Sequence, residues 1–487
     1  MKEASEGTRW EMHWEEVEVF DANSASLGVD EFVLMTAAGE ALAHEVEKAS
    51  GGGEVLFLCG PGNNGGDGFV AACSDVLAGN KISLLSSHES SKTETSSRAR
   101  GIAAKEFQIH VWPDFPKGDW TLIVDCLLGS GGAGSGSLLR SPIREVSSWA
   151  RSTGLPILSC DIPTGLGGPD ALKPIRTVTF HSPKMGMSES VCGEIVVAEL
   201  PWPVEVRNCG VGDASRLPPM KLDAKKGDRG RLLVVGGGPY HGAPLLSGLA
   251  AARSGCDLVH VAMPANASSR TQWPTSLIPE ELPDGEFLTL ESIVALSDFI
   301  DSRRSPDAMV IGPGIGREEG SMEAVREIIS LSISKSVPLV IDADAISALP
   351  VGKWPDGLIG VATPHSREAE RWLSGTSPRQ ALADCTKEGS AIVVTGYEDE
   401  ISGPEGRHCY ATGGHPRMAV SGTGDLLAGT IGGFLAQGMA PWPAARLGCA
   451  VLREAGSRAA QEKGPGLLAD DVPVHIAHTL SEWLGVG

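Results

Sequence analysis

The stretch CGPGNNGGDGFVAA, residues 59–72, closes an apolar run, EVLFLCG (54–60), and continues into a helical pattern. It places glycines and other small residues where a predicted strand ends. Backbone N–H groups at the start of a helix bind anions, usually a phosphate. The stretch matches neither the dinucleotide fingerprint G-x-G-x-x-G nor a P-loop, which ends in lysine. It therefore predicts an α/β fold with a phosphate-binding turn of another kind.

Further apolar runs predict two α/β domains, each built on a parallel sheet. The first series comprises residues 54–60, 81–86, 121–129, 155–163 and 194–200, and the second comprises residues 231–238, 257–264, 308–316, 338–346, 359–365 and 391–396. These runs are apolar throughout, which is typical of strands covered by helices on both faces. A polar, proline-rich segment separates the two series, so we expect domains at 1–214 and 215–487. Ligands then belong at the carboxyl ends of the strands.

Composition narrows the class of protein. The 487 residues carry a net charge of −21, which argues against nucleic acid as a partner. The ten cysteines form no C-x-x-C pair, which favours a reduced, cytoplasmic compartment. The N-terminal segment has no apolar core of a signal peptide, and no run of 18 apolar residues predicts a membrane span. We expect a homo-oligomer.

Two acidic residues end apolar strand runs in the first domain, Asp125 in LIVDCLLG and Asp161 in ILSCDIPTG. Such an acid either caps the next turn or belongs to a functional site, since burying an unpaired carboxylate costs several kcal/mol. Both acids together with the glycine turn favour a site. Oxygen atoms of Asn64, Asp125 and Thr164 are candidate ligands of a cation. The segment GSGGAGSGS (129–137) is either a flexible linker or a second phosphate-binding loop.

The order of GPGNNGGDG, VDCLLG and DIPTG resembles the NAD(P)H-hydrate epimerase family, the YjeF N-terminal domains, over residues 15–212. The resemblance implies a Rossmann-like fold and a potassium ion held by Asn64, Asp125 and Thr164. It implies Asp161 as the acid/base residue. It also implies that the phosphates of the substrate lie on two loops, formed by Asn63, Asn64, Gly65, Gly66 and Asp67 and by Gly129, Ser130 and Gly131.

In the second domain, SGTGDLLAGTIGGFLAQG (421–438) begins with a glycine turn and continues as a helix. Asp425 in its first turn is either a residue that favours the helix N-terminus or a base beside a phosphate, as phosphoryl transfer requires. GPGIGR (312–317) is a second glycine turn. His365 follows another strand, where a histidine is either structural or functional. Asp342 and Asp344 repeat the pattern of acids at a strand end.

KGDRGRLLVVGGG, GPGIG, DADAI, TPH and GTGD, in this order, resemble the ribokinase-like NAD(P)H-hydrate dehydratases over residues 218–485. The resemblance implies Asp425 as the base and ADP or ATP, with magnesium, as co-substrate. The hydrate would contact Gly316, His365, Ser366, Arg367, Glu368, Arg371 and Asp425. The nucleotide would contact Thr395, Gly396, Asp399, His415, Met418, Ala419, Ser421, Gly422, Thr423 and Gly424. Thr395 stands where the family usually has lysine, and Arg417 is the candidate to restore that charge.

Together the two resemblances predict a bifunctional enzyme that repairs hydrated NADH and NADPH, by epimerisation in the first domain and nucleotide-dependent dehydration of the S epimer in the second. One alternative is a small-molecule kinase of the hydroxymethylpyrimidine or thiazole type, which shares the Gly-Thr-Gly-Asp turn. The other is a non-catalytic scaffold built on the first domain. A scaffold has no need to keep Asn64, Asp125 and Asp161 together.

Overall fold

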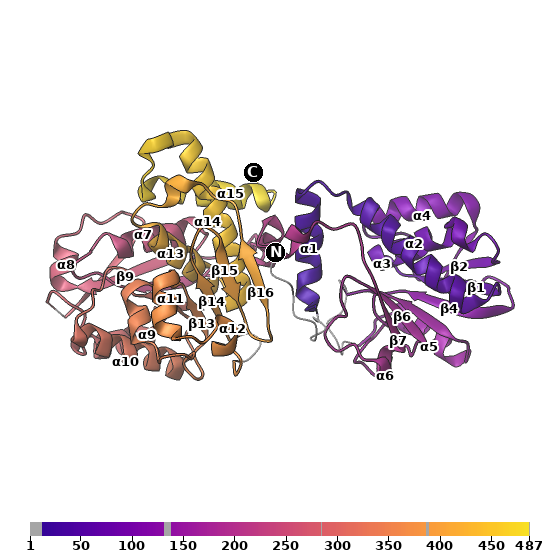
Figure 1. The fold of residues 1–487 in the computed structure, drawn as a ribbon, viewed down its shortest axis with the longest axis horizontal. Coiled ribbons are helices and arrows are strands. Elements are labelled where there is room, and N and C mark those ends of the chain that lie inside the picture. The colour runs from indigo at the N-terminus through magenta and orange to yellow at the C-terminus, as the bar shows by residue number, and fades with distance from the viewer. Residues whose placement is uncertain (1–11, 131–137, 284, 386–388, 487) are drawn as a thin grey trace. The chain divides into compact units, whose positions relative to one another are not determined.

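The computed structural model describes residues 12–130, 138–283, 285–385 and 389–486. The chain forms two compact units, one up to Val206 and one from Arg207 onward (Figure 1). The boundary expected after residue 214 thus falls inside the second unit. Across the described ranges, we find no helix with the length and apolar character needed to span a bilayer.

The N-terminal unit contains a seven-stranded sheet in the order β3-β2-β1-β4-β5-β6-β7, with every pair parallel. The order reverses between β1 and β4, which makes this the edge where ligands bind in open α/β sheets. The strands are β1 Glu54–Cys59, β2 Ile82–Ser86, β3 Ile109–Val111, β4 Trp120–Cys126, β5 Ile157–Cys160, β6 Arg176–Phe180 and β7 Glu194–Ala198. The helices are α1 Trp14–Ser26, α2 Glu31–Ser50, α3 Asn63–Ala72, α4 Glu94–Glu106, α5 Ile143–Ser152 and α6 Glu189–Cys192.

Side chains of alternate residues in β1 point to opposite faces of this sheet. Val55 and Phe57 of β1 pack in one apolar cluster with residues of α2, α3 and α4. Leu56 and Leu58 pack in a second cluster with residues of α5. Since both faces are covered, the strand is apolar from Val55 to Cys59, as its sequence predicted.

The glycines of the opening motif lie mainly inside α3 rather than in a loop. A Cβ atom on Gly65 would come within 2.0 Å of the carbonyl oxygen of Gly60, and one on Gly66 within 2.4 Å of Met35. On Gly68 it would lie 2.8 Å from the sulfur of Cys126. The motif is therefore glycine-rich because α3 packs directly against the sheet and α2, and its N-terminus still faces the edge of the sheet.

The C-terminal unit contains a nine-stranded sheet in the order β10-β9-β8-β11-β12-β13-β14-β15-β16. Its strands are β8 Arg231–Val235, β9 Leu258–Pro264, β10 Ile278–Leu282, β11 Ala308–Ile311, β12 Leu339–Ile341, β13 Gly360–Ala362, β14 Ser390–Val394, β15 Asp399–Ser402 and β16 His408–Ala411. Its helices are α7 Ala243–Arg253, α8 Ala265–Ser269, α9 Glu291–Ile300, α10 Glu319–Lys335, α11 Ser366–Leu373, α12 Pro378–Ala381, α13 Thr423–Ala436, α14 Pro441–Lys463 and α15 Pro473–Trp483.

Every predicted strand run contains an observed strand, but the prediction of wholly parallel sheets is wrong for the second unit. There, β14 pairs antiparallel with β15, and β15 pairs antiparallel with β16. The sequence did not predict five strands, because each is short and mixes polar with apolar residues. They are β3, β6, β10, β15 and β16. A short hairpin at a sheet edge needs no continuous apolar run.

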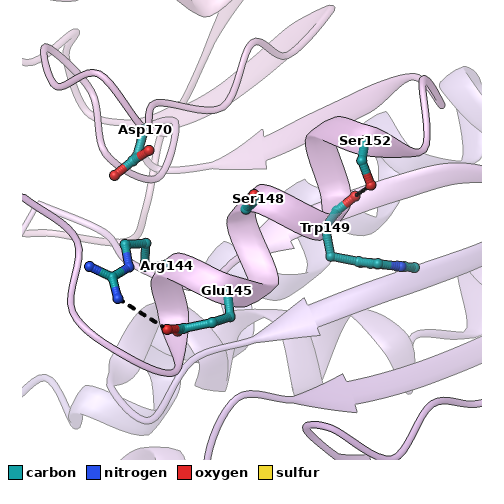
Figure 2. A pocket seen from close by; sticks show the side chains of 6 residues that line it. All are labelled: Arg144, Glu145, Ser148, Trp149, Ser152 and Asp170. Carbon is teal, nitrogen blue, oxygen red and sulfur yellow. Dashed lines mark hydrogen bonds and ion pairs between the residues drawn. The ribbon is translucent and has the colours of Figure 1, made fainter.

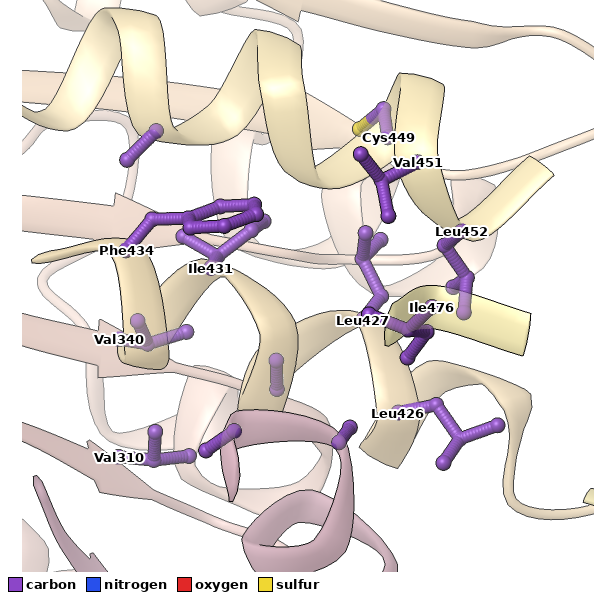
Figure 3. Close-up of a cluster of buried hydrophobic side chains, with 14 of the residues drawn as sticks. Val310, Val340, Leu426, Leu427, Ile431, Phe434, Cys449, Val451, Leu452 and Ile476 are labelled. Carbon is purple, nitrogen blue, oxygen red and sulfur yellow. The ribbon is translucent and has the colours of Figure 1, made fainter. Parts of the chain in front are cut away.

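Helix α13 lies at the centre of the larger apolar core of the second unit. Leu426, Leu427, Ile431 and Phe434 on this helix pack with Val310 of β11 and with residues of β12, α14 and α15 (Figure 3). On the opposite face of the sheet, a second cluster joins the strands to α9, α10 and α11. The core thereby fixes the N-terminus of α13, where Asp425 lies, against the sheet.

Helix α13 packs so closely against α7 that Gly429 leaves no room for a side chain. A Cβ atom on Gly429 would lie 2.0 Å from the backbone oxygen of Ser247 on α7. We expect Gly429→Ala to destabilise this unit by ~1–3 kcal/mol, the usual cost of overpacking. Gly320→Ala on α10, where a Cβ meets nothing within 4 Å, is the matched control and should leave stability unchanged or slightly higher. Thermal unfolding measures both, and equal Tm values for the two variants would contradict this packing.

Candidate functional site

Three segments that follow strands meet where the strand order of the N-terminal sheet reverses. The first turn of α3, after β1, carries Asn64, and the loops after β4 and β5 carry Gly129 and Asp161. A Cβ atom on Gly129 would lie 2.9 Å from Oδ2 of Asp161 and 3.2 Å from Asn64, so the three residues are direct neighbours. The structure thus brings together the residues that the sequence placed at strand ends. Gly131 lies outside the described residues.

Asp161 is held in a conformation that few non-glycine residues adopt, with φ of 62°. The residue is 7% exposed, and its Oδ2 accepts a hydrogen bond of 2.7 Å from the backbone N–H of Ser130. Its Oδ1 lies 2.9 Å from Nζ of Lys184. Burial would raise the pKa of Asp161, but the Lys184 ammonium and the Ser130 bonds outweigh it and lower the pKa. Asp161 is therefore a carboxylate paired with an ammonium.

Lys184 is the main residue of this site that sequence reasoning missed. It is 2% exposed, and Nζ also donates to Oγ1 of Thr179 and to the backbone oxygen of Phe180, each at 2.9 Å. The lysine follows β6, which the sequence analysis did not identify as a strand. The alternating run RTVTF (176–180) was the available signal, because a strand there places Lys184 at the same sheet edge as Asp161.

Burial, and then the charge of Asp161, raises the pKa of two further acids. Asp67 in α3 is 9% exposed, and burial followed by the charge of Asp161 raises its pKa well above the usual value. Asp21 on α1, which the sequence analysis did not single out, has its pKa raised to about 7 by burial and then by Asp161. The site therefore combines a low-pKa carboxylate and a lysine with two acids that hold protons more tightly.

Asp125 and Thr164 form a buried pair beside this centre. Both side chains are fully buried, and Asp125 accepts bonds from the Thr164 N–H at 2.9 Å and hydroxyl at 2.7 Å. Ser159 and the N–H of Leu127 also donate to it. Burial outweighs these bonds and raises the pKa of Asp125. No lysine, arginine or histidine side chain is recorded in an ion pair with it among the described residues.

The side-chain amide of Asn64, in contrast, is not hydrogen-bonded to any residue that the structure describes. The residue is 8% exposed, and within the described ranges neither its side-chain oxygen nor its nitrogen finds a hydrogen-bond partner. A buried amide left in this state costs ~1–3 kcal/mol, which usually marks a group that serves a ligand. No cluster of three or more His, Cys, Asp or Glu residues suited to a metal occurs in the described part of the chain. One carboxylate with neutral oxygens instead fits a singly charged cation.

A surface hollow of about 570 Å³ over α5 contains none of these residues (Figure 2). Its charged groups already pair within the protein, as Arg144 with Glu145 at 3.3 Å and Asp170 with Arg151 at 3.1 Å. The hollow is therefore no candidate for the phosphate site. It is lined by Arg144, Glu145, Ser148, Trp149, Ser152 and Asp170.

In the second unit, the first turn of α13 and the carboxyl end of β12 bring two acids close together. Asp342 is 4% exposed and accepts a bond of 2.8 Å from the Thr363 hydroxyl. Its pKa is raised to about 6, mainly by burial. Burial and then the charge of Asp342 raise the pKa of Asp425 to about 7. Asp425 therefore has the pKa of a general base that works near neutral pH.

His365 begins α11 and caps it. Its Nδ1 accepts bonds from the N–H groups of Arg367 and Glu368, and the Glu368 carboxylate accepts one from the His365 N–H at 3.1 Å. Arg317, another residue that the sequence analysis did not assign, binds Asp344 at 2.6 Å and lies 3.8 Å from Glu368. This fixes the residues after Gly316 and the start of α11 in one charged cluster. His365, Ser366, Arg367 and Arg371 are exposed.

The residues expected to contact a nucleotide occupy two exposed segments and the start of α13. Gly422, with φ of 99°, precedes the helix, and a Cβ atom on Gly424 meets nothing within 4 Å. This open helix N-terminus suits an anion. Asp399 departs from the expectation, because it is 6% exposed and pairs with Arg453 at 2.8 Å. Exposed positions are Gly396, His415, Ala419, Ser421 and Gly424, while Thr395, Met418, Gly422 and Thr423 are half-buried.

Comparison with known proteins gives each unit a family. The model described as the YjeF-related protein N-terminus matches residues 31–186. The model described as NAD(P)H-hydrate dehydratase matches residues 232–477. A solved ADP/ATP-dependent NAD(P)H-hydrate dehydratase from Bacillus subtilis, co-crystallized with ATP/Mg²⁺, aligns with 56% of this chain and 96% of that chain, at 21% identity and a TM-score of 0.44.

Relatives that span both units are similar along almost the whole chain. The bifunctional NAD(P)H-hydrate repair enzyme of Hyperthermus butylicus is 34% identical, covering 96% of this chain and 91% of that protein. The enzyme of the same name from Pyrobaculum aerophilum is 34% identical over 94% of this chain and 95% of that protein. The Rossmann-like and ribokinase-like fold classes expected from the sequence are confirmed. With both units matched in one order, the chain belongs to the family of bifunctional NAD(P)H-hydrate repair enzymes.

Proposed function

We propose that the N-terminal unit interconverts the R and S epimers of hydrated NADH and NADPH, and that the C-terminal unit dehydrates the S epimer with ADP or ATP. The observation that carries the first half is the Asp161–Lys184 pair at the sheet edge where ligands bind. The second half is carried by Asp425, whose raised pKa suits a base, at the open N-terminus of α13. The family relationship supports both halves.

In the first unit, epimerisation requires proton movement at or near the hydrated ring carbon. Asp161, ionised and held by Ser130 and Lys184, is the group that takes a proton. The buried Lys184 ammonium keeps that carboxylate oriented and holds a proton for return. The N-terminus of α3, with Asn63 in its first turn, supplies backbone N–H groups for the substrate phosphates.

A potassium ion fits beside this centre. Asn64 offers a buried oxygen without a partner, and Asp125 is a buried carboxylate whose recorded contacts are hydrogen bonds. Thr164 adds its hydroxyl or carbonyl oxygen. When bound, the ion supplies positive charge next to the phosphates of the substrate. We therefore assign Asn64, Asp125 and Thr164 as its ligands.

In the second unit, the reaction is a phosphoryl transfer followed by loss of phosphate. Asp425 takes the proton of the hydrate's ring hydroxyl as that oxygen accepts the terminal phosphoryl group of the nucleotide. Departure of phosphate and loss of a ring proton then restore the nicotinamide double bond. The nucleotide lies against residues 395–399 and 415–424, with magnesium on its phosphates, and the hydrate lies near Gly316 and the start of α11.

The two alternatives are not favoured. A small-molecule kinase leaves the N-terminal unit unexplained, whereas the relatives match both units. A scaffold leaves the buried Asp161–Lys184 pair and the unpartnered amide of Asn64 unexplained. A homo-oligomer and a cytoplasmic location stay predictions.

The first prediction concerns Asp425. Asp425→Asn should lower nucleotide-dependent dehydration by ~10²–10⁴-fold, because a general base contributes that much. In the unchanged enzyme the dehydration rate should fall about tenfold per pH unit below about 7 and level off above it, since only the carboxylate accepts a proton. Absorbance of the restored dihydronicotinamide measures both. Epimerisation should persist in the variant, and dehydration within about twofold of the parent would refute the assignment.

A second prediction tests the cation. Replacing sodium chloride by potassium chloride at equal ionic strength should raise the Tm of the N-terminal unit, because an ion that binds the folded state stabilises it. Asn64→Leu fills the same space without polar atoms, so it should unfold at or above the parent Tm in sodium, with no response to potassium. Epimerisation should be lost in this variant. The assignment is wrong if potassium raises the Tm of Asn64→Leu as much as that of the parent.

A third prediction concerns Asp161. Asp161→Asn preserves shape and removes the group that accepts a proton, so epimer exchange should stop while the second unit still works. A mixture of R and S hydrates with nucleotide should then react only until the S epimer is consumed. Lys184→Gln should give the same plateau. Complete consumption of both epimers, faster than they interconvert without enzyme, would remove Asp161 from the mechanism.

A further inference from the structure

The guanidinium of Arg453, on α14, uses all of its hydrogen-bond donors within the protein. Nε donates to Oδ2 of Asp399 at 2.8 Å, and Nη2 lies 2.8 Å from Oδ1 of the same residue. Nη2 also donates to the backbone oxygen of Gly396 at 3.0 Å. Nη1 donates to the backbone oxygens of Tyr397 at 2.9 Å and Gly413 at 2.8 Å. A guanidinium has five N–H donors, so none remains for a ligand.

These bonds join two segments that are separate in sequence. Gly396 and Tyr397 lie between β14 and β15, whereas Gly413 follows β16. The N–H of Gly396 also donates to Oδ1 of Asp399 at 3.1 Å, so the first segment closes on the same carboxylate. Arg453 therefore ties the backbone of residues 396–397 to Gly413, which lies just before the second segment that is expected to contact a nucleotide.

The same face of α14 also contacts the second segment, at Met418. Gly456 lies three residues after Arg453, and residues at this spacing share a helix face. A Cβ atom on Gly456 would lie 2.4 Å from the sulfur of Met418, so the glycine makes room for that side chain. Arg417, the cation expected to replace the missing lysine, is exposed. Arg453, by contrast, donates hydrogen bonds to backbone oxygens of both segments.

We propose that Arg453 is a positioning residue that holds residues 396–399 and 413–418 in the conformation that binds the nucleotide. The inference rests on the proposed dehydration function. Arg453 acts through backbone carbonyls and Asp399, because it has no donor left for the nucleotide itself. Its pairing with Asp399 leaves no net charge, so its contribution is the shape of the loops. A preformed site binds more tightly because its loops need no ordering on binding.

Arg453→Gln tests this inference. The KM for the nucleotide should rise about tenfold or more, while kcat at saturating nucleotide and the KM for the hydrate stay within about twofold. Calorimetric titration with ADP and with ATP should show the same loss of affinity. Arg453→Lys keeps the charge but lacks the planar fork, so it should not restore binding. The matched control is Arg458→Gln on the same helix, which breaks ion pairs with Glu454 and Glu482 and should leave all constants unchanged.

A second variant covers the case in which Arg453→Gln fails to fold because Asp399 is left buried and charged. Arg453→Gln with Asp399→Asn removes both charges, and it should fold and show the same rise in nucleotide KM. Thermal unfolding of the C-terminal unit reports whether the variant is folded. A folded variant with the parent's nucleotide KM would overturn the inference while leaving the proposed function standing. If the parent enzyme itself shows no nucleotide-dependent dehydration, the proposed function and the inference about Arg453 are both wrong.

Discussion

Each unit depends on a carboxylate at the carboxyl edge of its sheet, Asp161 after β5 and Asp425 in the first turn of α13, and the neighbour of that carboxylate decides its chemistry. Asp161 has the Lys184 ammonium at 2.9 Å and keeps a lowered pKa. Asp425 has another acid, Asp342, as its neighbour and a pKa of about 7. Burial raises the pKa in both places, so the difference arises from the partner. The lowered pKa favours the carboxylate form of Asp161, whereas the raised pKa of Asp425 lets that residue gain or lose a proton near neutral pH.

The order of the strands and the packing of α13 place Lys184 beside Asp161 and Asp342 beside Asp425. Lys184 reaches Asp161 only because β6 adds to the sheet next to β5, so that the segments following the two strands share an edge. Asp342 and Asp425 come together because α13 packs across β11 and β12 with its N-terminus at the same edge. A parallel sheet gathers its carboxyl ends on one side, and this lets residues far apart in sequence act at one place.

The sequence was sufficient for the features that depend on continuous apolar strands. It predicted the two α/β units, the central strands, and the meeting of Asn64 and Asp161 at one sheet edge. It missed β6, and with it Lys184, because RTVTF alternates polar and apolar residues, although Thr177 and Thr179 are buried in a strand that pairs on both sides. It also missed the role of Arg453, since a helical arginine gives no sign of which carbonyl groups it contacts. His365 was identified from its position, but its part in capping α11 follows only from geometry.

The glycines of α3 bear on how such proteins are recognised. Gly65, Gly66 and Gly68 are required because a helix lies against a strand and a neighbouring helix, whatever ligand is present. A descendant that lost catalysis but kept its fold would keep these glycines too. The glycines of GPGNNGGDG therefore report architecture, and the activity that we propose depends instead on Asn64, Asp161 and Lys184. A survey that sorts active enzymes from inactive descendants should read these three positions first.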